Sequence, residues 1–185
     1  MKDVVAPQDV LARIPQQISF EQAAPLMCAG ITVFNALRHS GAGPGDTVAI
    51  HGIGGLGHLG AHDYIDSAEA SAGEALTRLG GAVAVLSTVG SSPAQADLVQ
   101  GLRPNGQLMI IAADHEPVPV PPDLLVFGRR RVVGWYSGHA KDSEDAMTFA
   151  ALHDIRPMVE PHPLEEAEAT FQNMSRACYR AVLTP

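Results

Sequence analysis

The sequence is poor in cysteine, in aromatic residues and in basic residues. Its two cysteines, Cys28 and Cys178, lie far apart, so they form neither a disulfide framework nor a zinc-finger spacing. Lysine and arginine together number 12, against 20 aspartates and glutamates. The only basic run, Arg129–Arg131, is read as a solvated strand edge. This balance of charge argues against a nucleic-acid-binding protein.

Long hydrophobic runs are also missing. No stretch reaches the roughly 20 apolar residues that a transmembrane helix requires, and the first residues lack a signal-peptide pattern. We therefore expect a cytoplasmic protein with no membrane partner. What the 185 residues do contain is 46% hydrophobic residues, which is enough for the core of one domain or slightly more.

One stretch organises the rest of the chain. A short apolar run, Val48–Ile50, predicts a buried strand and is followed by glycines at the spacing G-x-G-x-x-G. In a dinucleotide-binding turn these glycines allow the tight turn, the approach of a pyrophosphate and the close packing of the next helix. The glycines alone are a weak signal, with an ordinary turn as the alternative, but their place after a strand favours dinucleotide binding. The candidate cofactor-binding residues of this stretch are Gly52, Gly54, Gly55, Leu56 and Gly57.

Helical and extended segments alternate along the chain. This pattern predicts an α/β fold with a mainly parallel, Rossmann-like sheet and flanking helices. Ser19 and Gln22 have the form of a capping box and predict a helix that continues to Arg38. Further helices are expected over residues 70–79, 93–102, 143–153 and 164–178. Extended segments are expected over residues 4–7, 61–66, 83–86, 107–113, 124–127, 131–136, 158–160 and 179–183.

The Rossmann-like pattern fails just after the glycines. Only His58–Gly60 separates Gly57 from the next strand-like segment, whereas a parallel crossover requires at least about ten residues. The acidic residue that holds the cofactor ribose, about 20 residues past the glycines, is missing as well. We therefore expect an incomplete sheet, from which the second strand and its adjoining helices are absent.

Several ordered motifs together resemble the zinc-dependent alcohol dehydrogenases of the medium-chain dehydrogenase/reductase family. They are Ala24–Phe34, Gly43–Val48, Gly52–His58, Leu102–Gly106, Arg156–Met158 and Pro163–Glu166, and they cover nearly the whole chain. The resemblance implies an oxidoreductase that moves a hydride between an alcohol and its aldehyde or ketone. Its expected cofactors are NAD or NADP and a zinc ion that acts as a Lewis acid on the substrate oxygen. A small alcohol or aldehyde is the expected partner.

The resemblance also implies site residues on the helix before the glycines. Cys28 matches a ligand of the catalytic zinc, and the alternative is a buried cysteine that fills a packing position. Thr32 matches a catalytic-site position that lines the nicotinamide pocket. The alternative for Thr32 is a helical threonine that bonds its own backbone.

Three further positions are implied near the end of the chain. Trp135 and Ser137 match the segment whose backbone meets the nicotinamide carboxamide. The alternative for Trp135 is a core aromatic residue whose N–H is satisfied. Arg180 matches an arginine that reaches the cofactor pyrophosphate, and its alternative is a surface residue beside Glu165 or Glu168.

Two parts of the family pattern are missing from this sequence. The N-terminal catalytic domain, which supplies the other two zinc ligands, is represented only by a remnant at residues 1–18. The segment expected after Gly60 is also absent, through a deletion, a damaged gene or numbering that closes over further residues.

The predicted organisation is completed by a dinucleotide-binding domain at 19–160 and a C-terminal helix and strand at 161–185.

With one zinc ligand of three, the chain as drawn is expected to be inactive. Two alternatives remain open: a non-catalytic α/β domain that self-associates through a sheet edge, and a zinc-free member similar to quinone reductases. Because members of the family commonly dimerise through the last strands of this domain, we expect a homo-oligomer formed near Leu124 to Tyr136.

Overall fold

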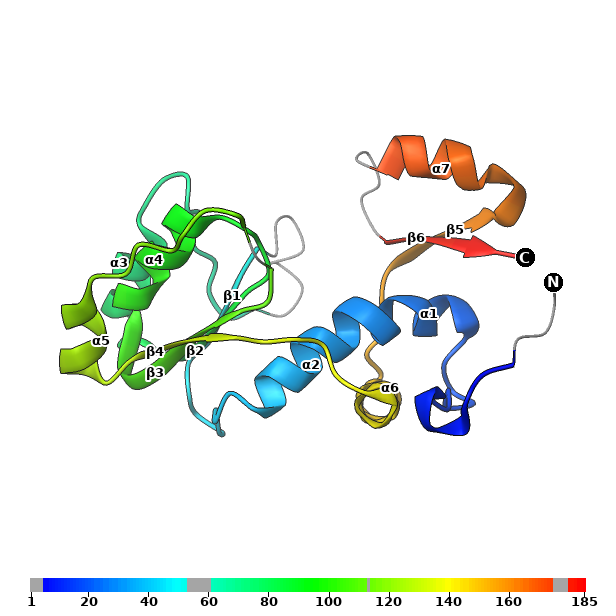
Figure 1. Ribbon diagram of the computed structural model, residues 1–185, viewed down its shortest axis with the longest axis horizontal. Coiled ribbons are helices and arrows are strands. Elements are labelled where there is room, and N and C mark those ends of the chain that lie inside the picture. The colour runs from blue at the N-terminus through cyan, green and yellow to red at the C-terminus, as the bar shows by residue number, and fades with distance from the viewer. Residues whose placement is uncertain (1–4, 53–60, 113, 175–179) are drawn as a thin grey trace. The chain divides into compact units, whose positions relative to one another are not determined.

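The computed structural model describes residues 5–52, 61–112, 114–174 and 180–185 (Figure 1). The chain divides into two compact units. One comprises Met1–Asn35 together with Ser137–Pro185, and the other comprises Ala36–Tyr136. We call them the two-segment unit and the sheet unit.

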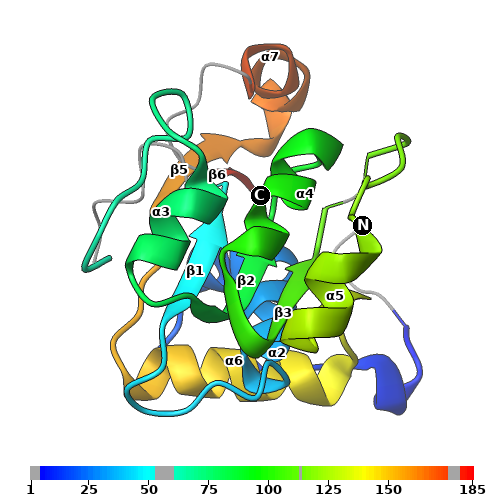
Figure 2. The same ribbon diagram turned by 90° about the vertical axis from the view of Figure 1, so that its left-hand side faces the viewer.

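The sheet unit contains a parallel sheet of four strands in the order β1-β2-β3-β4. The strands are β1 (Val48–His51), β2 (Ala82–Ser87), β3 (Leu102–Ile110) and β4 (Arg131–Gly134). The helices are α3 (Ala72–Arg78), α4 (Ser92–Gln100) and α5 (Pro122–Gly128), which lie over one face of the sheet (Figure 2). The predicted α/β architecture with a parallel sheet is therefore confirmed.

Both faces of this sheet are packed, as the apolar run Ala82–Leu86 of β2 requires. On the face that α3 and α4 cover, the core is formed by Leu76, Val85, Leu98, Val99, Leu102 and Leu108. On the opposite face, the core is formed by Ala36, Val83, Ala84, Leu86 and Met109. All six residues of β2 are buried, so this strand is the centre of the unit.

The missing strand of the sequence pattern is missing from the sheet as well. β1 pairs directly with β2, with Val48 opposite Ala84 and His51 opposite Ser87. In a complete Rossmann-like sheet, a second strand lies on the other side of the first one. Among the described residues no strand occupies that side, and β1 is an edge strand.

The two-segment unit joins helices from both ends of the chain. The chain passes through α1 (Phe20–Pro25) and a π-helical turn, η2 (Leu26–Gly30), into α2 (Ile31–Arg38), which continues into the sheet unit. The predicted capping box is confirmed, because the Ser19 side chain accepts from Gln22 N and the Gln22 side chain accepts from Ser19 N. The remaining elements are η1 (Gln8–Val10), α6 (Ala140–Leu152), β5 (Val159–Pro163), η4 (Leu164–Glu166), α7 (Ala167–Asn173) and β6 (Arg180–Thr184).

A separate small core holds this unit together. Ile18, Ala23 and Leu26 pack against Met147 and Ala150 of α6. β5 and β6 form a two-stranded parallel sheet. Sequence positions more than a hundred residues apart therefore share one core.

Two segments predicted as extended are not strands. Residues 61–66 have no strand partner, and Ile65 instead packs its side chain against the core of the sheet unit. Residues 124–127 belong to helix α5, which begins after Pro121 with Pro122 and Asp123 in its first turn. A run of four apolar residues does not separate a strand from a buried helix, and the prolines were the signal of a helix start.

Several predicted boundaries are also wrong. β3 begins at Leu102 rather than at residue 107, because Leu102 already pairs with Ala82. The register then shifts before Gln107 pairs with Ala84, and Asn105, at φ 64°, lies in this interval. α6 begins three residues early, with His139 as its cap. Residues 5–7 form no strand, and helix α7 ends before residue 175. No described helix is both long enough and apolar enough to cross a membrane.

Candidate functional site

The carboxyl end of β1 has the turn that the first motif glycine was predicted to form. Gly52 has φ 104°, a conformation that side chains rarely adopt. A Cβ atom there would lie 2.3 Å from Cγ2 of Val89 and 2.6 Å from Oγ1 of Thr88. Thr88 holds the turn, because its amide and its hydroxyl both donate to the carbonyl of His51, at 2.9 Å each. Gly54, Gly55, Leu56 and Gly57 lie outside the described residues.

Beneath this turn lies a buried polar network that sequence reasoning missed. Nε2 of Gln95 donates to the carbonyls of Val89 and Ala112 at 3.0 Å and lies 3.2 Å from Oγ of Ser87. Ser87 Oγ is in turn 3.0 Å from Nδ1 of His51. Gln95 and Ser87 are at most 1% exposed. The network ties together the carboxyl ends of β1, β2 and β3, the edge where α/β sheets bind ligands.

Burial lowers the pKa of His51 below its ordinary value of 6.5. The folded chain therefore binds a proton at His51 less readily than the unfolded chain does. We expect the free energy of unfolding to be largest above this ordinary value and to decrease as the pH falls below it. Urea titrations across this pH range will measure the decrease.

The His51 contribution is isolated by comparing variants. His51→Gln should show a smaller loss of stability on acidification than the wild type. His115→Gln, at an exposed position, should follow the wild-type curve. Identical pH dependence in His51→Gln and the wild type would contradict the prediction.

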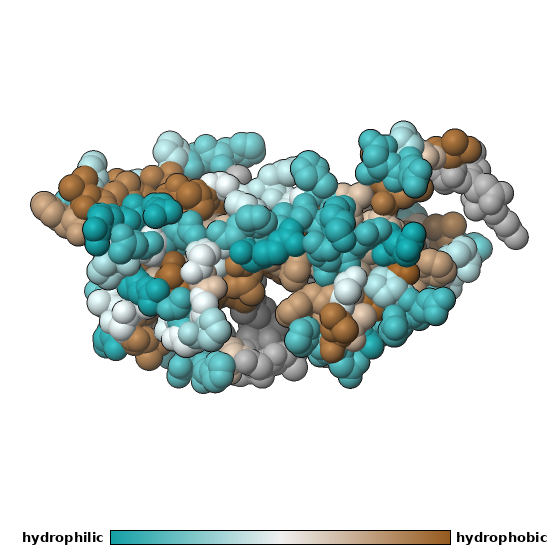
Figure 3. All heavy atoms as spheres, turned by 90° about the horizontal axis from the view of Figure 1, so that it is seen from below, coloured by the Kyte–Doolittle hydropathy of each residue, from teal (hydrophilic) through white to brown (hydrophobic). Residues whose placement is uncertain are grey.

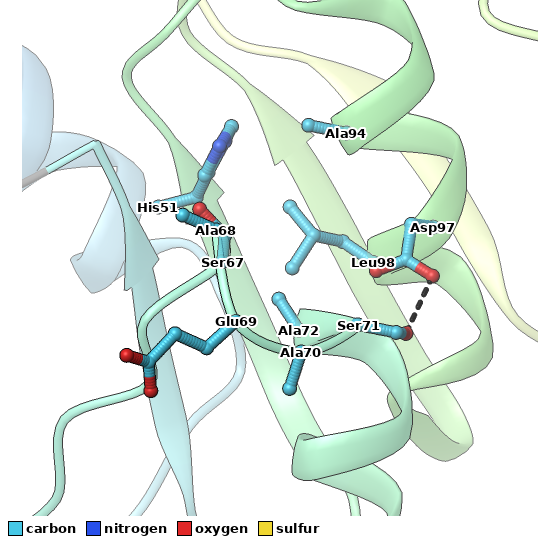
Figure 4. Close-up of a pocket in the computed structure, with 10 residues that line it drawn as sticks. All are labelled: His51, Ser67, Ala68, Glu69, Ala70, Ser71, Ala72, Ala94, Asp97 and Leu98. Carbon is cyan, nitrogen blue, oxygen red and sulfur yellow. Dashed lines mark hydrogen bonds between the residues drawn. The ribbon is translucent and has the colours of Figure 1, made fainter.

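A cavity of about 420 Å³ opens beside His51 (Figure 4). Its lining residues are His51, Ser67, Ala68, Glu69, Ala70, Ser71, Ala72, Ala94, Asp97 and Leu98. The small apolar side chains of Ala70, Ala72 and Leu98 occupy the middle of the view, whereas the carboxylate of Glu69 points away from them. The cavity is therefore lined by apolar and polar groups in similar measure.

Asp97, which lines this cavity from α4, already accepts several hydrogen bonds. Asp97 accepts hydrogen bonds from Ser71 Oγ at 2.8 Å, from Gly73 N at 2.9 Å and from the Gln100 side chain. Burial raises the pKa of Asp97, but these hydrogen bonds outweigh it, and the net pKa lies below the ordinary value. Asp97 thus holds the start of α3 against α4.

In the two-segment unit, the structure brings together two of the predicted site residues, Thr32 and Ser137. Their hydroxyl oxygens are 3.1 Å apart. Thr32 Oγ1 also donates to the carbonyl of Cys28 at 2.6 Å, so the alternative of a threonine bonded to its own backbone is realised as well. Asn35, which the sequence did not single out, donates from Nδ2 to the carbonyl of Ser137 at 2.9 Å.

Cys28 has an exposed side chain in the π-helical turn η2. The alternative of a buried packing cysteine is therefore wrong. A catalytic zinc takes three protein ligands, and no group of three or more His, Cys, Asp or Glu residues among the described positions is arranged to hold a metal. The described residues therefore do not fit a catalytic zinc.

The last two predicted residues lie in different units. Trp135 stacks on His39 with ring centroids 4.9 Å apart and packs against the core of the sheet unit. Its indole Nε1 is buried and has no hydrogen-bond partner in the described part of the chain, contrary to the satisfied N–H of the alternative reading. Arg180 is exposed at the start of β6, and none of the described carboxylates forms an ion pair with it.

The sequence resembles known alcohol dehydrogenases over almost its whole length. Residues 30–152 match the zinc-binding dehydrogenase family. An alcohol dehydrogenase of Penicillium expansum is 36% identical and covers 96% of this chain, which spans 61% of that relative. An alcohol dehydrogenase of Geobacillus stearothermophilus is 31% identical and covers 91% of the chain, which spans 59% of that relative.

Solved structures show the same fold. The CAD protein from Helicobacter pylori complexed with NADP(H) superposes with a TM-score of 0.67 at 20% identity, over 93% of this chain and 56% of that one. This chain therefore spans about three fifths of the length of the relatives that it matches.

The matched stretch of the Penicillium relative is longer than this chain. It extends over 207 positions, whereas this chain has 185 residues. The difference means that at least 22 positions of the match have no counterpart here. The relative thus has residues within the shared region that this chain lacks. Together with the fold, these matches establish that the chain belongs to the zinc-binding dehydrogenase family.

Proposed function

We propose that this chain is the cofactor-binding part of an oxidoreductase of the alcohol dehydrogenase type. In this proposal it binds NAD or NADP weakly and oxidises no alcohol by itself. The observation that carries the proposal is the turn at Gly52, where a positive φ and the absence of room for a Cβ occur at the carboxyl end of the first strand. That is the place at which a glycine-rich turn presents backbone amides to a pyrophosphate.

Further residues would hold the cofactor in this proposal. The predicted pyrophosphate-binding residues Gly54, Gly55, Leu56 and Gly57, and the predicted contribution of Arg180, remain part of this proposal. The backbone around Trp135 and Ser137 would meet the nicotinamide, with Thr32 and Asn35 holding Ser137 by the hydrogen bonds described above. The bound cofactor supplies the hydride acceptor or donor. The protein side chains would bind and orient it.

The proposed absence of alcohol oxidation rests on the missing partners of Cys28. A zinc ion acts on an alcohol only when protein ligands hold it and leave a position open for the substrate. A single exposed thiol does not provide that site. The alcohol and aldehyde substrates that the family implies would therefore belong to a protein that supplies the other ligands.

Cofactor binding is expected to be weak and unselective. The carboxylate that binds the ribose hydroxyls in NAD-dependent proteins follows the second strand, and the described residues contain no such strand beside β1. We expect NADH and NADPH to bind with dissociation constants within about threefold of each other, because the residues that distinguish the 2′-hydroxyl from the 2′-phosphate are absent. Titration of each cofactor, followed by its fluorescence or by amide NMR shifts, will test this.

Variants make the binding test specific. Gly54→Val should abolish the response to both cofactors, and Gly43→Ala should leave it unchanged, because the nearest atom to a Cβ at Gly43 is 3.9 Å away. No measurable response in the wild type would overturn the proposed cofactor binding. Formation of NADH from NAD and a simple alcohol at ordinary enzyme rates would overturn the proposed lack of activity.

The second candidate function is self-association near Leu124 to Tyr136. The observation that favours it is the exposed apolar surface there, since Val126 is 67% exposed, Phe127 is 88% exposed and Tyr136 is 87% exposed. Hydrophobic side chains gather over α5, at the left of the view in Figure 3. Patches of this kind mark interaction surfaces.

We place the chain in the cytoplasm, and the domain limits at 18/19 and 160/161 stay predictions.

A further inference from the structure

We propose that the open edge of β1 pairs with β1 of a second copy of this chain. The two strands run antiparallel across a twofold axis at Ala49 and join two four-stranded sheets into one. This interface is distinct from the surface near Leu124 to Tyr136, because β1 and β4 are at opposite ends of the strand order. It does not depend on cofactor binding.

The backbone of β1 has hydrogen-bonding groups directed away from the sheet. The carbonyls of Thr47 and His51 accept from Val83 N and Thr88 N on the β2 side, each at 2.9 Å. In a parallel ladder the residues of one strand alternate between its two neighbours. The amides and carbonyls of Val48 and Ile50 therefore point to the open side, where none of the described strands pairs with them.

The side chains of β1 fit an interior position better than an edge. The strand Val48–His51 has no lysine, no proline and no bulge, which are the usual protections of an edge strand. Ile50 is 47% exposed. A strand without charged side chains, whose outward backbone groups are paired with none of the described strands, is a template for pairing with another strand.

A second copy is the partner that this strand fits. With Ala49 opposite its own counterpart, Val48 lies opposite Ile50 of the second copy and Ile50 opposite Val48. These two hydrogen-bonded pairs use all the outward amides and carbonyls and form four hydrogen bonds. The next two pairs, in each of which Thr47 lies opposite His51, bring no like charges together. The strand is thus complementary to itself in hydrogen bonding and carries no like charges that would oppose the pairing.

Cross-linking tests the register directly. Both native cysteines are first replaced by serine, and Ala49→Cys is then introduced. Cα atoms of a non-hydrogen-bonded antiparallel pair lie about 4.5 Å apart, within the range of a disulfide. Val48→Cys is the matched control, because its own counterpart is displaced by two residues and lies about 7–8 Å away. We expect Ala49→Cys to form a covalent dimer under mild oxidation at least about tenfold faster than Val48→Cys.

Mass measurements over a range of concentrations provide the second readout. The full chain should show a concentration-dependent dimer, and Ile50→Lys should weaken it about tenfold. Ile50→Thr keeps a β-branched residue and serves as the test if the lysine variant does not fold. It should weaken the dimer by less than tenfold. Phe127→Lys, at an exposed position on α5, should still permit the Ala49→Cys cross-link.

Three results would overturn the proposal. The first is a monomer at every concentration. The second is an equal cross-linking rate for Ala49→Cys and Val48→Cys. The third is a dimer that Phe127→Lys abolishes and Ile50→Lys leaves intact, which would place the interface at α5.

Discussion

Gly73→Ala is expected to lower the free energy of unfolding of the sheet unit by about 3 kcal/mol, the upper part of the usual range for an overpacked core. An ideal Cβ at Gly73 would lie 2.1 Å from the backbone carbonyl oxygen of Asp97 and 2.6 Å from Cγ of Gln100. The Gln100 side chain can rotate, but the carbonyl belongs to the backbone of α4. The two helices would have to separate, and Leu76 and Leu98, which share one core, would lose contact.

The consequence of this separation would extend to the hydrogen bonds of Asp97. Its carboxylate accepts from Gly73 N at 2.9 Å, so a displaced α3 also leaves this acid partly unpaired. Denaturant titrations followed by the fluorescence of Trp135, the only tryptophan, will measure the change. Gly134→Ala is the matched control, because no atom lies within 4 Å of a Cβ there. A loss below 1 kcal/mol in Gly73→Ala would show that the helices do not approach as closely as described.

Gln95→Leu is expected to cost about 2 kcal/mol, for a different reason. The side chain is 1% exposed, and its Nε2 donates to the carbonyls of Val89 and Ala112 at 3.0 Å each. Leucine fills nearly the same space but donates nothing. The carbonyl of Val89 keeps its hydrogen bonds from Ser91 N and the Ser87 hydroxyl. The carbonyl of Ala112 is left without this donor, at about 1–3 kcal/mol for an unsatisfied buried group.

The comparison that isolates this effect uses a glutamine at the surface. Gln172 donates to Glu168 at 2.8 Å in an exposed position, so Gln172→Leu should change stability by no more than about 0.5 kcal/mol. If Gln95→Leu proved equally mild in calorimetry or denaturant titration, the network at the carboxyl ends of the strands would have no stabilising role.

The sequence was informative where one local signal acted alone. Ser19 and Gln22 located the first helix, and the apolar run before Gly52 located the first strand. The gap after Gly60 indicated the missing strand. Each of these signals depends on neighbours in the sequence, and the structure agrees with all three.

The sequence was less informative where distant residues decide. Residues 124–127 read as extended because four apolar residues fit a strand or a helix equally well, and the packing of Leu124 and Leu125 against the core selects the helix. Gln95 gave no signal, because its role depends on carbonyls brought to it by two other segments. Asn35 was missed for the same reason, since Ser137 lies 102 residues further along the chain.

One unit is continuous in the sequence and the other is formed from two separate segments. This difference determines when each unit can fold during synthesis. The sheet unit is a single stretch, Ala36–Tyr136, so it can fold while the rest is still being translated. The core of the other unit cannot form until Met147 and Ala150 have been synthesised, because these residues pack against Ile18 and Leu26. Until then the side chains of Ile18 and Leu26 remain exposed. In this interval the nascent chain is most accessible to chaperones and most prone to aggregation.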